Sequence, residues 1–108
     1  MAVVALVALA TAAVGTTGAA LHARSAAQSA ADLGALAAAY EARDLRAMGV
    51  EATKPHAQVC GRARTVLTRN GARLHRCEVH RDGSVTVESA VTWGPGEVCR
   101  TARAGTAP

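Results

Sequence analysis

The chain has 108 residues and a formal net charge of +4, and half of its residues are hydrophobic. Alanine supplies much of that half, phenylalanine is absent and Tyr40 and Trp93 are the only aromatic residues, so there is room for one small domain with few large core side chains. The basic residues are dispersed among acidic ones with no base-stacking aromatics between them, which argues against a nucleic-acid partner.

The N-terminal segment, residues 1–23, contains no Lys, Arg, Asp or Glu. An apolar stretch of about 20 residues is long enough to cross a bilayer as a helix, so we expect a single-pass transmembrane helix in contact with membrane lipid. The alternative is a cleaved secretory signal. The stretch is longer than such signals usually are and no basic residues precede it, which favours a retained span.

We expect the C-terminal part of the chain to lie outside the cell membrane. The distribution of charge alone does not predict this orientation, because the first charged residue, Arg24, follows the span. We hypothesise that a short basic leader precedes Met1 and restores that orientation. Within the span, Gly15 and Gly18 leave one helix face nearly bare, which favours close helix packing and a homo-oligomer.

Beyond the span, apolar residues recur at helical spacing and predict that the helix continues as an Ala-rich rod. This stripe contains Leu33, Leu36, Ala37 and Tyr40, and continues to Leu45 and Met48. Gly49 is suited to cap a helix end. We therefore predict one element over residues 1–48, a transmembrane anchor and continuous helix.

The sequence of residues 49–93 predicts a small extracytoplasmic unit, in which an amphipathic helix packs on a β-hairpin. The helix begins near Pro55 and ends at Asn70-Gly71. Alternation of period two follows from Leu74, and a three-residue loop, 81–83, brings the alternating apolar residues to one face if Gly83 takes a positive φ. The expected fold class is α+β.

The last segment, residues 94–108, is small and polar and is expected to be a flexible tail.

The three cysteines lie beyond the apolar segment. Cys60 on the second helix and Cys77 on the hairpin face each other in the predicted arrangement, and a disulfide between them would contribute about 3 kcal/mol. Cys99 is left as the odd thiol. The Cys and His spacings match no compact zinc module and no catalytic motif, so we expect no metal, no cofactor and no enzymatic activity.

Three segments together resemble a known family: the uncharged N-terminus, the run QSAADLGALAAA at residues 28–39, and NGARLHRCEV at residues 70–79. The chain resembles the short TadE-like proteins of actinobacteria, small pseudopilin-like membrane proteins associated with Flp (Tad) type IV pilus and secretion genes. The resemblance implies a membrane-anchored pilus-assembly component that packs against pilin-like partners by its long helix. The alternative is a secreted, disulfide-stapled binding domain with a cleaved signal segment.

Overall fold

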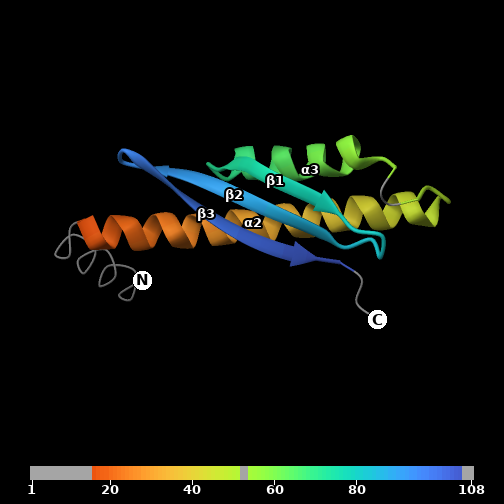
Figure 1. Ribbon diagram of the computed structural model, residues 1–108, viewed down its shortest axis with the longest axis horizontal. Helices are drawn as coiled ribbons and strands as arrows, with labels where there is room; N and C mark the ends of the chain where they lie inside the picture. The colour runs from red at the N-terminus through yellow and green to blue at the C-terminus, as the bar shows by residue number, and fades with distance from the viewer. Residues whose placement is uncertain (1–15, 52–53, 106–108) are drawn as a thin grey trace, which may run out of the picture.

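The computed structural model describes residues 16–51 and 54–105. Helices α2 (Thr16–Ala47) and α3 (His56–Arg69) precede strands β1 (Arg73–Val79), β2 (Val85–Trp93) and β3 (Gly96–Ala104). The strands form one antiparallel sheet in the order β1-β2-β3, and both helices lie along it (Figure 1). The expected α+β class, with a long first helix, a second helix and a hairpin, is confirmed.

The side of α2 that faces the sheet is made almost entirely of alanine. Its buried apolar residues are Ala23, Ala27, Ala30, Ala31, Ala35, Ala38, Ala39, Ala42 and Leu45. Ala30, Ala35, Ala38, Ala42 and Leu45 share one core with apolar residues of α3 and β2. Side chains as small as alanine let the helix backbone approach its neighbours closely. Residues 30–45 of the predicted rod therefore belong to the same domain as α3 and the sheet.

Helix α3 is amphipathic, as its sequence predicts. Val59, Cys60, Ala63 and Leu67 are buried, which places its apolar side against α2 and β1. It ends at Arg69, and the backbone N–H of the C-cap residue Asn70 donates to the Val66 and Leu67 carbonyls.

The end of α2 is also closed by its own backbone. The N–H of Gly49, at φ 85°, donates to the Arg46 carbonyl, and the N–H of Val50 donates to the Leu45 carbonyl. These two bonds form a Schellman cap with Gly49 in the left-handed conformation. The predicted cap is confirmed, although the helix ends at Ala47.

The hairpin between β1 and β2 has the predicted three-residue loop. Val79 pairs with Val85, the His80 N–H donates to the Ser84 carbonyl, and the Gly83 N–H donates to the His80 carbonyl. Gly83 has φ 90°, the left-handed conformation that this loop requires. The loop thus brings the inward residues of both strands to one face.

The third strand was not expected, and the prediction of a flexible tail over residues 94–108 is wrong for residues 96–104. A two-residue turn, Gly94-Pro95, lets Trp93 pair with Gly96, and the ladder continues to the pair Val85 and Ala104. The inward residues Ala102 and Ala104 of β3 are small and pack against the core that α2 shares.

The predicted transmembrane span falls mostly on residues 1–15, which lie outside the described residues. Across residues 16–51 and 54–105, no helix combines the length and the apolar character needed to cross a membrane.

Candidate functional site

The outward side of α2 carries three large apolar residues. Leu33 and Leu36 are each 46% exposed and Tyr40 is 57% exposed; we call these three residues the α2 stripe. They recur at helical spacing, so they lie on one side of the helix, while the alanine side faces the sheet. Apart from the buried Leu45, the helix therefore has the inverse of the usual pattern, with small residues inside and large ones outside.

The sequence-predicted packing residues are thus only partly described. Leu33, Leu36 and Tyr40 share the exposed side of α2. Gly15 lies outside the described residues, and of Gly18 only its place within α2 is described.

The expected continuation of the stripe to Leu45 is wrong. Leu45 is 8% exposed and belongs to the core. It follows Tyr40 by five residues, which turns it about 140° around the helix axis, away from the stripe. Met48 is exposed but lies beyond the last residue of α2.

Two charged residues border the α2 stripe on the same flank. Asp32 and Arg43 are both exposed and are separated by 11 positions, or about three helical turns. The Gln28 side chain donates from Nε2 to Asp32 Oδ1 at 3.1 Å. Among the ion pairs of the described residues, none contains Asp32 or Arg43.

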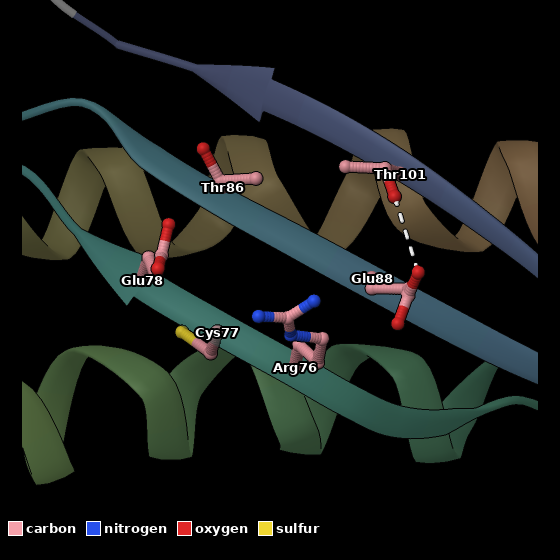
Figure 2. Close-up of a pocket in the computed structure, with 6 residues that line it drawn as sticks. All are labelled: Arg76, Cys77, Glu78, Thr86, Glu88 and Thr101. Atoms are coloured by element: carbon pink, nitrogen blue, oxygen red, sulfur yellow. Dashed lines mark hydrogen bonds between the residues drawn. The ribbon is translucent and has the colours of Figure 1, made fainter.

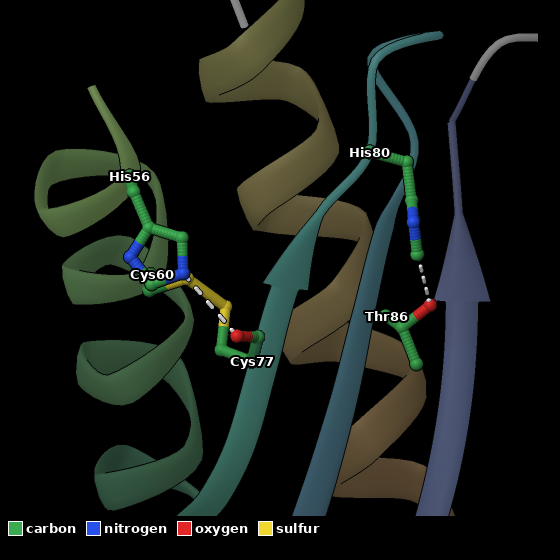
Figure 3. Close-up of a disulfide and its surroundings, with 5 residues drawn as sticks. All are labelled: His56, Cys60, Cys77, His80 and Thr86. Carbon is green, nitrogen blue, oxygen red and sulfur yellow. Dashed lines mark hydrogen bonds between the residues drawn. A yellow bond between two sulfur atoms is a disulfide. The ribbon is translucent and has the colours of Figure 1, made fainter. Parts of the chain in front are cut away.

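A disulfide joins Cys60 of α3 to Cys77 of β1, with a Cα–Cα distance of 5.9 Å (Figure 3). The His56 ring lies beside it, with Nε2 at 3.3 Å from the Cys77 carbonyl oxygen and 3.6 Å from Cys60 Sγ. Cys99 is a free, exposed thiol on β3. The Cys60–Cys77 disulfide therefore links helix α3 covalently to the edge strand β1.

The outer face of the sheet has a shallow, open pocket with side chains of both charges (Figure 2). It is lined by Arg76, Cys77, Glu78, Thr86, Glu88 and Thr101. The Thr101 hydroxyl and Glu88 Oε2 are 3.5 Å apart, and His75 Nε2 lies 3.5 Å from Glu88 Oε1. Nothing in this arrangement pairs a nucleophile with a base, so we treat it as a solvated strand surface.

A polar cluster that sequence reasoning missed holds the hairpin loop against α2 and β3. Arg46 Nη1 donates to the Asp82 carbonyl at 2.6 Å, and Arg103 Nη2 donates to Ser84 Oγ at 2.8 Å. Asp82 Oδ1 accepts from the Ser84 hydroxyl and backbone N–H, and these two bonds, followed by the charge of Arg103, lower the pKa of Asp82. The Asp-Gly-Ser sequence signals the turn but not its partners 36 and 19 positions away.

Metal chemistry has no candidate centre in the part of the chain that the structure describes. No group of three His, Cys, Asp or Glu side chains there could hold a metal ion.

Residues 1–43 match the family model described as putative Flp pilus-assembly TadE/G-like. Over that segment the chain is similar to TadE/G-like proteins. The predicted resemblance to TadE-like proteins is confirmed there, and the TadE/G-like segment contains the whole α2 stripe. No curated protein and no solved structure matches the chain.

Proposed function

We propose that this chain is a pseudopilin-like component of a Flp (Tad) pilus or secretion assembly, and that it acts by packing its α2 stripe against helices of other pilin-like proteins. The observation that carries the proposal is a coincidence on one helix: the TadE/G-like segment ends at residue 43, and the exposed large apolar residues Leu33, Leu36 and Tyr40 fall within it. A helix that turns its large residues outward has surface to offer a partner.

The proposed topology is a membrane anchor in the uncharged N-terminal segment, with the α3 and sheet region outside the membrane. The Cys60–Cys77 disulfide supports this, because disulfides persist in oxidising compartments such as the cell exterior. The proposed role is structural, and no catalytic step is assigned to any residue.

Co-purification from membranes tests the packing surface. In the organism's own pilus system, Leu36→Glu should reduce recovery of other pilus components by about tenfold or more, because a carboxylate would enter an apolar contact. Met48→Glu is the matched control, since Met48 is a large apolar residue, 71% exposed, outside the stripe. Equal recovery with both variants would contradict the assignment of the stripe.

Intact mass of the mature chain separates the proposal from its alternative, a secreted binding domain. A membrane-bound chain that keeps its apolar segment supports the anchor. A secreted chain that begins near Ala30 would refute it.

A further inference from the structure

The hairpin of β2 and β3 extends beyond the rest of the sheet. Strand β1 pairs with β2 only as far as Ala90, whereas β2 and β3 remain paired to the end of β2 at Trp93. We call residues 91–98 the hairpin overhang. Alternation along the two strands places Val91, Val98 and Trp93 on the face that packs on the helices, and all three are half-buried. The overhang therefore has an apolar face that no residue of β1 adjoins.

A buried hydrogen bond fixes the level of the overhang along α2. The Ser89 hydroxyl of β2 donates to the Ala27 carbonyl at 2.6 Å, and β2 runs from there obliquely toward the N-terminal end of α2 (Figure 1). Trp93 lies about 13 Å further along the strand than Ser89, which corresponds to about seven to nine residues of helix. Trp93 is therefore level with about residues 18–20 of α2, inside the uncharged segment that ends at Ala23.

We propose that the hairpin overhang lies on the lipid surface of the membrane that holds the chain's own anchor, with the Trp93 side chain at the level of the headgroups. The proposal rests on the topology proposed above, in which the uncharged N-terminal segment spans the membrane and α2 emerges from it. A hairpin end that is level with residues of that segment reaches the boundary between lipid and water. Tryptophan is enriched at this boundary, because its ring is apolar and its N–H is polar.

The end of the overhang carries no charge. Residues 92–96 have the sequence Thr-Trp-Gly-Pro-Gly, and all of them except Trp93 are exposed. Such a turn enters the headgroup layer without dehydrating an ionised group, and Pro95 has no backbone N–H that needs a partner there. The loop between β1 and β2, at the other end of the sheet, contains Arg81 and Asp82. Of these two turns, the one nearer the anchor is the one suited to lipid.

The charged residues in and beside the overhang leave a positive excess. Glu97, the one acidic residue of β3, pairs with Arg73. Arg24 of α2 and Arg100 of β3 are exposed, and neither belongs to an ion pair of the described residues. Arg24 lies about 6–9 Å above the level of Trp93, which is comparable to the thickness of one headgroup layer. The end of the domain nearest the membrane is therefore positive, which favours contact with anionic lipid.

Trp93 is the only tryptophan of the chain, so its fluorescence tests the proposal without any substitution. The full chain is reconstituted into vesicles of equal parts phosphatidylcholine and phosphatidylglycerol and excited where tyrosine does not absorb. Lipid brominated on the acyl carbons nearest the headgroup should reduce the Trp93 emission by about half or more, because the ring lies at that depth. Iodide in the water should reduce the emission far less.

Flotation of the same vesicles separates this proposal from the proposed anchor. If the chain floats with the vesicles but only iodide quenches Trp93, the anchor stands and the lipid contact of the overhang is refuted. If the chain does not float, the proposed anchor is refuted, and the lipid contact with it.

A charge placed at the end of the overhang is the second test. Pro95→Glu should reduce quenching by brominated lipid about threefold or more, because a carboxylate is excluded from the lipid boundary. Pro95→Ser is the neutral control at the same position and should be quenched like the original chain. Met48→Glu is the control for the added charge, since Met48 is exposed beyond the other end of α2, and it should also be quenched like the original chain.

The variants are compared at a temperature where circular dichroism shows that all of them are folded. Equal quenching of Pro95→Glu and Pro95→Ser, whether high or low, would overturn the proposal, because the charge would then not meet lipid. A loss in Met48→Glu as large as that in Pro95→Glu would overturn it too.

Discussion

Gly34 of α2 lies directly against Leu67 of α3, so that a Cβ added at Gly34 would overlap Leu67 Cδ1. Leu67 is fully buried and cannot swing away into solvent. The close approach of the two helices therefore depends on the missing side chain.

Gly34→Ala should destabilise the fold by about 1–3 kcal/mol, because the added methyl overpacks the contact with Leu67. This outweighs the gain of about 1 kcal/mol that alanine normally brings to a helix interior. Gly61→Ala is the matched control, since Gly61 is also helical but has open space around it, and it should stabilise the fold. Urea unfolding of both variants measures the difference, and a stabilised Gly34→Ala chain would contradict the contact.

Local patterns were enough to predict much of the fold. The apolar spacing of α3, the three-residue loop with Gly83 and the cap at Gly49 follow from rules that act within a few residues, and tertiary contacts did not override them. The predicted fold class is right for the same reason.

The buried side of α2 could not be read from its sequence by the usual rule that large apolar residues lie inside. Burying an alanine removes little apolar area, so its transfer free energy is small. What selects the alanine side is the close approach of α3 and the sheet, as at Gly34. The helical spacing of the α2 stripe in the sequence gives no indication that these residues face solvent.

Strand β3 was missed for a related reason. Its inward residues Ala102 and Ala104 are small, and Arg100, opposite the buried Ser89, interrupts the apolar series, so its alternation is faint. Its order depends on pairing with β2 and on cover from α2, which are both non-local.

Ala102→Asn should destabilise the fold by about 1–3 kcal/mol. Ala102 is half-buried opposite Val87, so the asparagine would place a polar amide in an apolar contact. The neighbouring control, Thr101→Asn, changes an exposed residue of the same strand and should cost less than about 1 kcal/mol. Thermal unfolding compares the two. Equal, negligible effects would indicate that this segment is a loose tail after all.

Removal of the disulfide by the double change Cys60→Ala and Cys77→Ala should cost on the order of 3 kcal/mol. The bond closes a separation of 17 residues, and its loss frees the unfolded chain. Cys99→Ser should have almost no effect on the free energy of unfolding, since Cys99 is free and exposed. Chemical denaturation reports both, and a similar loss in the two variants would contradict the pairing.

Ser89→Ala should destabilise the fold by about 1 kcal/mol. The Ser89 hydroxyl is buried and donates to the Ala27 carbonyl at 2.6 Å, which fastens β2 to α2. Ser29→Ala is the control, because Ser29 is exposed on the outward side of α2 and alanine is the better helix former. If both serines prove equally dispensable in urea unfolding, the bond does not contribute.

The pH dependence of stability should contain a contribution from Asp82. The Ser84 hydroxyl and N–H and then Arg103 lower the pKa of Asp82 below its ordinary value of 3.8. A carboxyl with a lowered folded pKa stabilises the protein above the unfolded pKa, and that stabilisation is lost as the pH falls through the folded value. Asp82→Asn should therefore be less stable than the original chain at pH 7, and the difference should shrink below about pH 4. A difference independent of pH would exclude this origin.

The alanine side of α2 also has a mechanical consequence. One uninterrupted helix runs from Thr16 through the core to Ala47, with β2, β3 and α3 along its length. A pull on its N-terminal end therefore loads many contacts at once, in shear, and does not peel them away one by one. A force applied to the N-terminal end of α2 is therefore transmitted to the whole domain through this one helix.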